Sequence, residues 1–325
     1  MPLISVIIPV FNGEKTIKET IESVLNQTWS DLEIIVINDG SNDSTLGILN
    51  RLQDPRLKIF SYSNAGLAAS RNRGIFLAIG KYISFIDADD VWTLDKLEAQ
   101  LNALKVNPQA AVAYSWTNWI DESGQFLRPG GHIIANGNVY EQLLKRDFIE
   151  SGSNVLIRTE ALTEVGSFDE SVKAVEDWDM WLRLAACYEF VCVPLPQILY
   201  RISPNSMSTD VLQMERSSLG VIEKALANAP QDLKIKKREI IGERYKYLTL
   251  KAIEGNLERR KGLAAVRFFL QAISNDPTWI KRTRLMSIVL FKIAIATIIS
   301  PQQSQVLLSK IKSIYEKAKE GKNDL

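Results

Sequence analysis

Two aspartates with one residue between them, Asp87 and Asp89, follow directly after a strand predicted over 81–86. Carboxylates at positions i and i+2 of a chain leaving a strand can point to the same side. Mg²⁺ and Mn²⁺ prefer such oxygen donors, and a cation held there would bridge and neutralise a diphosphate. The alternative interpretation of these residues is an acidic turn, in which aspartate accepts hydrogen bonds from its own backbone.

Other polar residues also follow strand-like runs. Asn12 comes after the run 3–10 and Asp39 after the run 33–38, and both runs are short, apolar and rich in β-branched residues. Such runs are typical of strands that are buried on both faces. In open α/β sheets, ligands bind outside the carboxyl ends of the strands. We therefore expect Asn12, Asp39 and the aspartates of 87–90 to share one crevice.

The elements that position these residues alternate between strand and helix. Helices are predicted over 14–27 and 67–79, and further strands over 58–60 and 111–114. This alternation predicts an α/β fold, with a mostly parallel sheet covered by helices on both faces. No G-x-G-x-x-G follows the first strand, and no G-x-x-x-x-G-K-[ST] occurs in the chain. Glycine-rich loops are therefore not expected to hold a phosphate here.

Several motifs occur in a characteristic order: PVFNG at 9–13, INDGS at 37–41 with Asp43, NAGLAASRNRG at 64–74, FIDADD at 85–90, GSFDE at 166–170 and EDWD at 176–179. As a set, they resemble the family 2 glycosyltransferases over about residues 3–208. The resemblance implies a GT-A fold, which is a Rossmann-like nucleotide-sugar-binding sheet. It also implies an inverting enzyme that takes its sugar from a nucleoside diphosphate.

Carried over residue by residue, the resemblance implies that four residues bind the base and ribose of a nucleotide sugar: Pro9, Phe11, Asn12 and Asp39. It places Asp87 at the ribose and diphosphate. It further implies that a Mn²⁺ or Mg²⁺ ion is held by Asp89 and Asp87.

The resemblance also makes Asp177 the catalytic base. An acceptor hydroxyl must lose its proton as it attacks the anomeric carbon, and a positioned carboxylate can accept that proton. Asp177 lies at the head of a helix predicted over 175–186, where the macrodipole favours the ionised form. A structural N-cap belongs at the same position. For the neighbouring Glu176 and Asp179 we predict a cap or a salt bridge.

Other side chains have both a functional and a structural interpretation. Arg71, on the helix over 67–79, can reach the diphosphate, or it can form a solvated face or an ion pair. Trp178 and Trp181 can stack on a sugar, but aromatic residues three apart on a helix favour a core position. His132 lies in a glycine-rich stretch, and we predict an exposed loop residue.

The chain departs from the family pattern at one position. Two residues after Tyr200-Arg201 the family often has a histidine, in the segment that closes over the diphosphate, whereas this chain has Ser203. Serine is a poorer metal ligand than histidine. We therefore expect metal binding to depend on Asp89 together with water and phosphate oxygens.

Composition limits the class of protein. The 325 residues are 46% apolar and 24% charged, which is typical of a soluble globular protein rather than a disordered chain or a polytopic membrane protein. One histidine and two cysteines, Cys187 and Cys192, do not suffice for a Cys₄ or Cys₂His₂ zinc site. Both cysteines lie in apolar sequence, and we predict buried reduced thiols. Met1-Pro2 leads into the first strand without a basic stretch, so no secretory signal is expected.

Charge divides the chain into two regions. Residues 1–210 carry 17 Lys+Arg and 27 Asp+Glu, a net charge of −10, and residues 211–325 carry 22 and 11, a net charge of +11. We predict a GT-A domain over 1–210 and a helical, basic C-terminal region over 211–325. A basic surface favours an anionic partner, and we expect a membrane surface rather than nucleic acid; a solvated helical bundle is the alternative.

The C-terminal region contains a 16-residue apolar run over 285–300 with Lys292 in its middle. Basic residues flank this run on both sides: Lys281, Arg282, Arg284, Lys310, Lys312, Lys317 and Lys319. A spanning helix needs about 20 apolar residues and a central lysine is costly, so spanning is not expected. Two interpretations remain: a buried helix packed on the preceding helical hairpin, and an interfacial helix at an anionic membrane, which the charge of +11 favours.

Together, these features predict a metal-dependent, inverting glycosyltransferase of hexosyltransferase type. We expect it to move a sugar, with a UDP-sugar as donor, to a saccharide or glycolipid acceptor during synthesis of cell-surface polysaccharide or glycolipid. The expected location is cytoplasmic and peripheral at the inner face of the cell membrane. Two alternatives remain: transfer to a polyprenyl phosphate, and a non-catalytic protein that binds sugar nucleotides.

Overall fold

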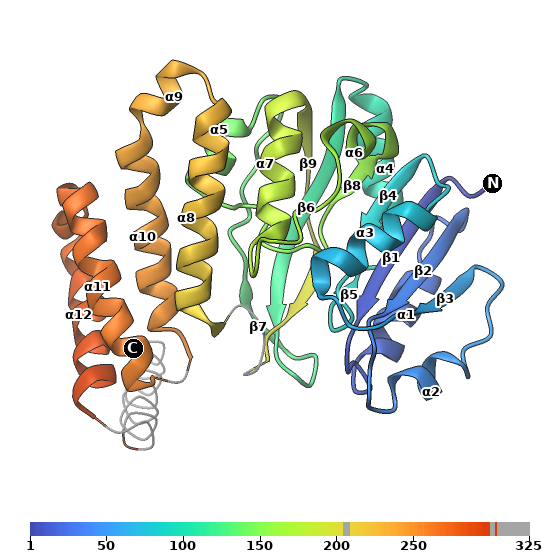
Figure 1. Cartoon of the computed structure of the whole chain (residues 1–325), viewed down its shortest axis with the longest axis horizontal. Helices are drawn as coiled ribbons and strands as arrows, with labels where there is room; N and C mark the ends of the chain where they lie inside the picture. The colour runs from blue at the N-terminus through green and yellow to red at the C-terminus, as the bar shows by residue number, and fades with distance from the viewer. Residues whose placement is uncertain (204–208, 256, 300–302, 304–325) are drawn as a thin grey trace, which may run out of the picture. The chain divides into compact units, whose positions relative to one another are not determined.

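The structure is a computed structural model that describes residues 1–203, 209–255, 257–299 and 303. The described residues fall into two compact units, with the division between residues 206 and 207. The first unit is α/β and the second is helical (Figure 1).

In the described part of the first unit, nine strands form one sheet in the order β3-β2-β1-β4-β8-β6-β9-β5, with β7 paired to β6. The strands are β1 (Ile4–Val10), β2 (Leu32–Asn38), β3 (Leu57–Ser61), β4 (Tyr82–Phe85), β5 (Val91–Trp92), β6 (Ala110–Ile120), β7 (Phe126–Pro129), β8 (Leu156–Arg158) and β9 (Glu189–Arg201). The predicted parallel pairing is confirmed for β1 to β4. The whole sheet is mixed, because β8 runs antiparallel to both β4 and β6, and β5 and β7 also join it antiparallel.

Helices cover both faces of this sheet, as predicted. They are α1 (Ile17–Leu25), α2 (Thr45–Leu49), α3 (Leu67–Leu77), α4 (Lys96–Val106), α5 (Tyr140–Lys145), α6 (Thr159–Val165) and α7 (Glu176–Cys187). Apolar side chains of α1 and α4 pack on the face of β1 that carries Val6 and Ile8. The intervening Ile7 points to the other face, where it contacts Gly74 of α3. Figure 1 shows α3 crossing the blue strands of the sheet.

Two expectations about the first unit are corrected. The strand predicted over 111–114 extends to residue 120, because its last residues pair with β7 and β9. These partners come later in the chain, so the local pattern did not predict the length. Cys192 is buried as predicted, but Cys187, at the end of α7, is exposed.

The second unit consists of α8 (Val211–Asn228), α9 (Gln231–Ile235), α10 (Lys237–Ala252), α11 (Arg259–Asn275), the short 3₁₀ helix η2 (Pro277–Lys281) and α12 (Thr283–Ile298). Helix α10 contacts both α8 and α11, and α11 contacts α12. At the last of these contacts a Cβ on Gly262 would lie 2.8 Å from Cβ of Ala296, so only glycine permits this approach of α11 to α12. The helical hairpin that we expected before the apolar run is present as α10 and α11, which contact each other.

Helix α12 contains most of the apolar run that we predicted to be either buried or interfacial. Met286, Val289, Ile293 and Ala296 are buried, while Ile288 and Phe291 are about half exposed. One face of α12 thus packs in the unit and another is open. Among the described residues, no helix has the length and apolar character that crossing a membrane requires. The four lysines that follow the run, from Lys310 to Lys319, lie outside the described residues.

Candidate active site

The carboxyl ends of three strands lie side by side at one edge of the sheet. Strand β1 pairs in parallel with both β2 and β4, and these strands end at Val10, Asn38 and Phe85. Asn12, Asp39 and the aspartates of 87–90 come directly after these ends. The predicted convergence of these residues on one edge is confirmed.

The loops after β1 and β2 are bonded to each other through Asn12. Its Oδ1 accepts a hydrogen bond from the N–H of Asn42 at 2.9 Å, and its own N–H donates to Oγ of Ser41 at 2.9 Å. Its φ of 53° lies in the left-handed region, which asparagine tolerates better than most residues. Pro9 is buried in β1, and Phe11 is 53% exposed. The contact of Pro9, Phe11 and Asn12 with a base remains a prediction.

Asp39 holds the start of α3. Its carboxylate accepts hydrogen bonds from the N–H groups of Ala65 at 3.0 Å and Gly66 at 2.8 Å. It also forms an ion pair with Arg73 at 2.9 Å. The INDGS and NAGLAASRNRG motifs are thus joined by one buried carboxylate. The assignment of Asp39 to the base and ribose remains a prediction.

Arg71 is buried between two carboxylates. Its Nη2 lies 2.7 Å from Asp87 and its Nη1 lies 2.8 Å from Glu176, and 1% of its side chain is exposed. Burial disfavours the charge, but Asp87 and Glu176 outweigh it and raise the pKa of Arg71. A Cβ on Gly152 would lie 2.3 Å from Nη2, so only glycine fits beside the guanidinium. The solvated-face interpretation of Arg71 is wrong, and the ion-pair interpretation is confirmed.

The acidic turn after β4 contains two more carboxylates after Asp87. Asp89 is partly buried and Asp90 is fully buried. Burial, followed by the charge of Asp87, raises the pKa of Asp89 to about 6. Asp90 is fully buried and accepts hydrogen bonds from Oγ of Ser153 at 2.5 Å and from the N–H of Arg201 at 3.0 Å. Ser153 Oγ also accepts from the N–H of Asp87 at 2.9 Å. Hydrogen bonds therefore fix this turn at both ends.

Arg201 at the end of β9 is a residue that sequence reasoning missed. Its side chain is 4% exposed, and its Nε donates to the backbone oxygen of Asp89 at 2.8 Å. Its Nη1 donates to the carbonyls of Asp121 and Glu122, and its Nη2 pairs with Glu19 at 2.6 Å. Arg201 thus connects the acidic turn, which contains the predicted metal ligand Asp89, with β9 and α1. The Tyr200-Arg201 pair marks this position in the sequence, but no local spacing indicates a contact across 112 positions.

Asp177 lies in the first turn of α7, next to Glu176. Its Oδ1 accepts a hydrogen bond from the N–H of Trp178 at 2.8 Å, and its side chain is partly buried. Burial, followed by the nearby charge of Asp147, raises the pKa of Asp177 to about 6, although Arg71 acts in the opposite direction. The prediction that the macrodipole favours the ionised form is therefore outweighed by burial. A carboxyl with this pKa is still mostly ionised at pH 7.

The arrangement joins the acidic turn to the start of α7. Glu176 is paired with Arg71, and Arg71 with Asp87, so a continuous set of charges runs from Asp87 to the residue next to Asp177. Such a site can bind a cation at the turn and accept a proton at α7.

A family comparison identifies the kind of protein to which this site belongs. The sequence model described as glycosyltransferase like family 2 matches residues 5–252. The chain belongs to this family. The match extends beyond residue 208, where the resemblance was expected to end, through α8 and α10 of the helical unit.

Family 2 relatives with known sequences agree with this assignment. The chain is 36% identical over 190 residues to an uncharacterized glycosyltransferase of Rickettsia bellii, covering 56% of this chain and 27% of that protein. It is 32% identical over 197 residues to the chondroitin synthase of Pasteurella multocida, covering 58% and 20%. It is 30% identical over 210 residues to an uncharacterized glycosyltransferase of Methanocaldococcus jannaschii, covering 63% and 72%. The chain spans less than a third of the length of the Rickettsia bellii and Pasteurella multocida proteins.

Solved structures support the fold of this family 2 chain. S. aureus TarS has a TM-score of 0.57 at 17% identity, with 91% of this chain and 54% of that chain covered. TarS 1–349 in complex with UDP-GlcNAc has a TM-score of 0.55 at 18% identity, with 94% and 84% covered. The fold is therefore GT-A-like, with a helical C-terminal region.

The remaining candidates have structural contacts. Glu176 and Asp179 form ion pairs, the latter with Arg183 at 2.9 Å, as predicted. Trp178 and Trp181 are 1% and 0% exposed, so their core interpretation is confirmed and sugar stacking is wrong.

His132 is not an exposed loop residue. It is partly buried and stacks on Trp116, with ring centroids 4.7 Å apart and an interplanar angle of 9°. Its φ of 44° lies in the left-handed region.

The carboxylates of the turn fit a divalent cation that substrate oxygens help to hold. Asp89 has no ion-pair partner among the residues that the structure describes, and burial together with the charge of Asp87 raises its pKa. No cluster of three or more His, Cys, Asp or Glu side chains suited to a metal occurs in that part of the chain. Mg²⁺ commonly binds through one or two carboxylates with phosphate and water completing the shell. Ser203 follows β9 and is partly buried, whereas 204–206 lie outside the described residues.

Proposed function

We propose that this chain is an inverting glycosyltransferase of hexosyltransferase type that moves one sugar from a UDP-sugar to an acceptor hydroxyl. The observation that carries this proposal is the partly buried Asp177, with a pKa of about 6, beside the charge set Asp87, Arg71 and Glu176. Family membership supports a transferase. The name of the TarS complex with UDP-GlcNAc supports a uridine nucleotide as donor.

The proposed reaction is a single displacement. The acceptor oxygen attacks the anomeric carbon and forms the new glycosidic bond, while the bond from that carbon to the diphosphate oxygen breaks. The nucleoside diphosphate leaves with the electron pair of the broken bond, and the acceptor proton passes to the Asp177 carboxylate. One displacement inverts the anomeric configuration, and a single base suffices for it.

The residues of this chain organise that reaction. Arg71 keeps the carboxylates of Asp87 and Glu176 in place at 2.7 and 2.8 Å. Arg201 fixes the backbone of the turn at Asp89, and Ser153 fixes it at Asp87. Asp87 and Asp89 would hold Mn²⁺ or Mg²⁺, and the bound cation supplies positive charge to the leaving diphosphate.

The acceptor we propose is a saccharide or a glycolipid, in synthesis of cell-surface polysaccharide or glycolipid. Support comes from relatives named as chondroitin synthase and hyaluronan synthase, each 32% identical over 197 residues. We propose a cytoplasmic location, peripheral at the inner face of the cell membrane, where nucleotide sugars and lipid-linked acceptors meet.

Turnover of nucleotide sugars tests the proposal. The purified chain is incubated with UDP-, GDP- and dTDP-sugars, Mn²⁺ and a panel of saccharide acceptors, and released nucleoside diphosphate is measured. We expect release from a UDP-sugar that depends on Asp177, and a product of opposite anomeric configuration by NMR. Binding of a sugar nucleotide without turnover on any acceptor would instead favour the non-catalytic binding protein. Retained anomeric configuration would contradict the single displacement.

A further inference from the structure

Helix α12 has an open apolar face. Ile288, Phe291 and Ile298 are 49%, 47% and 81% exposed, and they recur at a spacing that places them on one side of the helix. Leu290 is a further half-exposed residue, at 50%. The opposite side, with Val289, is buried in the helical unit. The open face is therefore a surface of the folded unit and not an exposed core.

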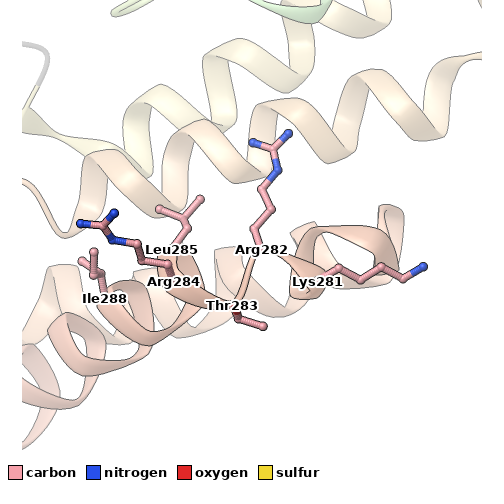
Figure 2. Close-up of a pocket in the computed structure, with 6 residues that line it drawn as sticks. All are labelled: Lys281, Arg282, Thr283, Arg284, Leu285 and Ile288. Carbon is pink, nitrogen blue, oxygen red and sulfur yellow. The ribbon is translucent and has the colours of Figure 1, made fainter.

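Basic side chains lie at the beginning of this helix. Lys281, Arg282 and Arg284 are exposed, and together with Thr283, Leu285 and Ile288 they line a shallow pocket of about 590 Å³. Figure 2 shows Arg282, Arg284 and Lys281 extending from the turn between η2 and α12, with Leu285 and Ile288 beside them on the helix. Cations and apolar groups are thus combined in one surface.

No acidic group of the described structure compensates these cations. Lys281, Arg282 and Arg284 form no ion pair with any residue that the structure describes. In the sequence, no acidic residue occurs between Asp276 and Glu316. Other cations of the same unit are paired: Lys246 lies 2.7 Å from Glu243, and Arg267 is bonded to Glu215. The beginning of α12 therefore combines three exposed cations without an acidic partner among the described residues.

We propose that this surface, Lys281, Arg282 and Arg284 with the exposed side chains Ile288 and Phe291, docks on a bilayer that contains anionic lipids. The cations fit phosphate and carboxylate headgroups, and the apolar side chains fit the boundary of the acyl chains. The inference rests on the membrane location proposed above and not on the transfer reaction. It names the residues and the lipid chemistry of that location.

Vesicle co-sedimentation tests this docking. The full chain is mixed with vesicles of phosphatidylcholine alone or with 30% phosphatidylglycerol, at low and at high salt. We expect binding only to the anionic vesicles and weaker binding at high salt, because the Debye length shortens. Changing Arg282→Glu together with Arg284→Glu should lower the partition coefficient at least about tenfold.

A matched double variant controls for net charge. Arg259 and Arg260 are exposed at the start of α11, and Gly262 nearby contacts Ala296 near the end of α12. This pair therefore lies near the end of α12, away from Arg282 and Arg284 at its beginning. Arg259→Glu with Arg260→Glu changes the net charge equally, and we expect less than about a threefold effect, since charges away from the surface interact weakly. Changing Ile288→Ser with Phe291→Ser should weaken vesicle binding several-fold. The binding that remains at high salt should fall most, because apolar contacts are not screened by salt.

The outcomes separate the two proposals. Release of nucleoside diphosphate in solution should be unchanged in all three double variants, because none of the changed residues belongs to the acidic turn or to α7. Equal recovery in the supernatant with neutral and anionic vesicles would overturn the docking surface while leaving the transferase proposal intact. Equal losses for the arginine pairs 282/284 and 259/260, or undiminished binding without the former, would also overturn it.

Discussion

The two units of the chain each contain a cation between two carboxylates, but in different surroundings. In the first unit Arg71 lies between Asp87 and Glu176, and in the second Lys246 lies between Glu243 and Asp276. The side chain of Arg71 is 1% exposed and that of Lys246 is 13% exposed. The partners Glu176 and Asp276 are 7% and 28% exposed.

The acidic partners respond in opposite directions. Burial raises the pKa of Glu176 even though Arg71 is 2.8 Å away, and the charge of Asp177 adds to this effect. The hydrogen bond from Lys246 and those from Thr278 lower the pKa of Asp276 to about 2. The same pattern of charges therefore costs free energy where it is buried and stabilises where water reaches it.

This difference supports the proposed role of the first arrangement, because carboxylates with raised pKa values cluster at active sites. In the first unit they gather at the carboxyl edge of the sheet, at Asp89, Glu176 and Asp177. The ion pairs around Lys246 connect α10 with the residue that precedes η2.

Removing Arg71 should produce the largest effect. Arg71→Met leaves Asp87 and Glu176 without their cation, so we expect a loss of about 3–5 kcal/mol in the free energy of unfolding at pH 7, together with loss of turnover. Urea denaturation measures the loss. The folded pKa of Glu176 should rise further, so the deficit should shrink as the pH falls from 7 towards 5. A loss below about 1 kcal/mol would mean that the pair behaves as a surface ion pair.

Asp89→Asn tests the carboxylate of the acidic turn that has no ion-pair partner among the described residues. If a cation binds there, one of its few anionic ligands is lost, and turnover should fall by about 10³-fold, corresponding to several kcal/mol. Calorimetry should show weaker donor binding in Mn²⁺. The thermal midpoint at pH 7 should rise rather than fall, because the folded pKa of Asp89, about 6, is above its usual value and its ionisation costs stability. Full activity of the wild type in excess chelator would contradict the metal role of Asp89.

Asp177→Asn separates catalysis from stability. The amide cannot accept a proton, so transfer should fall by about 10²-fold or more while donor binding stays near normal. Because the folded pKa of Asp177, about 6, is above its usual value, its ionisation costs stability once the pH exceeds the usual carboxyl range. The variant should therefore have a higher thermal midpoint than the wild type at pH 7.

The pH profile gives a second measurement on the same residue. Since Asp177 must be deprotonated to act, kcat/KM of the wild type should fall tenfold per pH unit below about 6. An equal loss of transfer found only in Glu176→Gln or Asp179→Asn would contradict the assignment of Asp177 as base.

Local patterns predicted the elements that place this site. The β-branched runs 3–10 and 33–38 became Ile4–Val10 and Leu32–Asn38, because strands buried on both faces need continuous apolar sequence. The aspartates after such strands reached one edge because parallel strands align their carboxyl ends. Trp178 and Trp181 became core residues, as their helical spacing indicated.

Contacts between distant segments were not predictable in this way. The pairing of Arg71 with Glu176 spans 105 positions, and the bond from Arg201 to Asp89 spans 112. Both depend on how β8, β6 and β9 join the sheet, and these pairings follow no local periodicity. The burial of Arg71 was not predictable for the same reason. The sequence of its helix does not indicate which face Arg71 occupies, and its partners come from distant segments.

Removing Lys246, the cation between Glu243 and Asp276, should have the smallest effect. In Lys246→Met, Asp276 keeps its hydrogen bonds from the N–H and Oγ1 of Thr278, and Glu243 is 42% exposed, so water replaces the lost cation. We expect a loss of about 1 kcal/mol or less in the free energy of unfolding at pH 7. The folded pKa of Asp276, about 2, is below the usual value of 3.8, so its contribution is present above about pH 4. The difference between wild type and variant should therefore disappear as the pH falls through 2, and 0.5 M salt should also reduce it. Urea denaturation at several pH values measures this difference. A loss of unfolding free energy as large as that of Arg71→Met would show that burial does not distinguish the charges around Lys246 from those around Arg71.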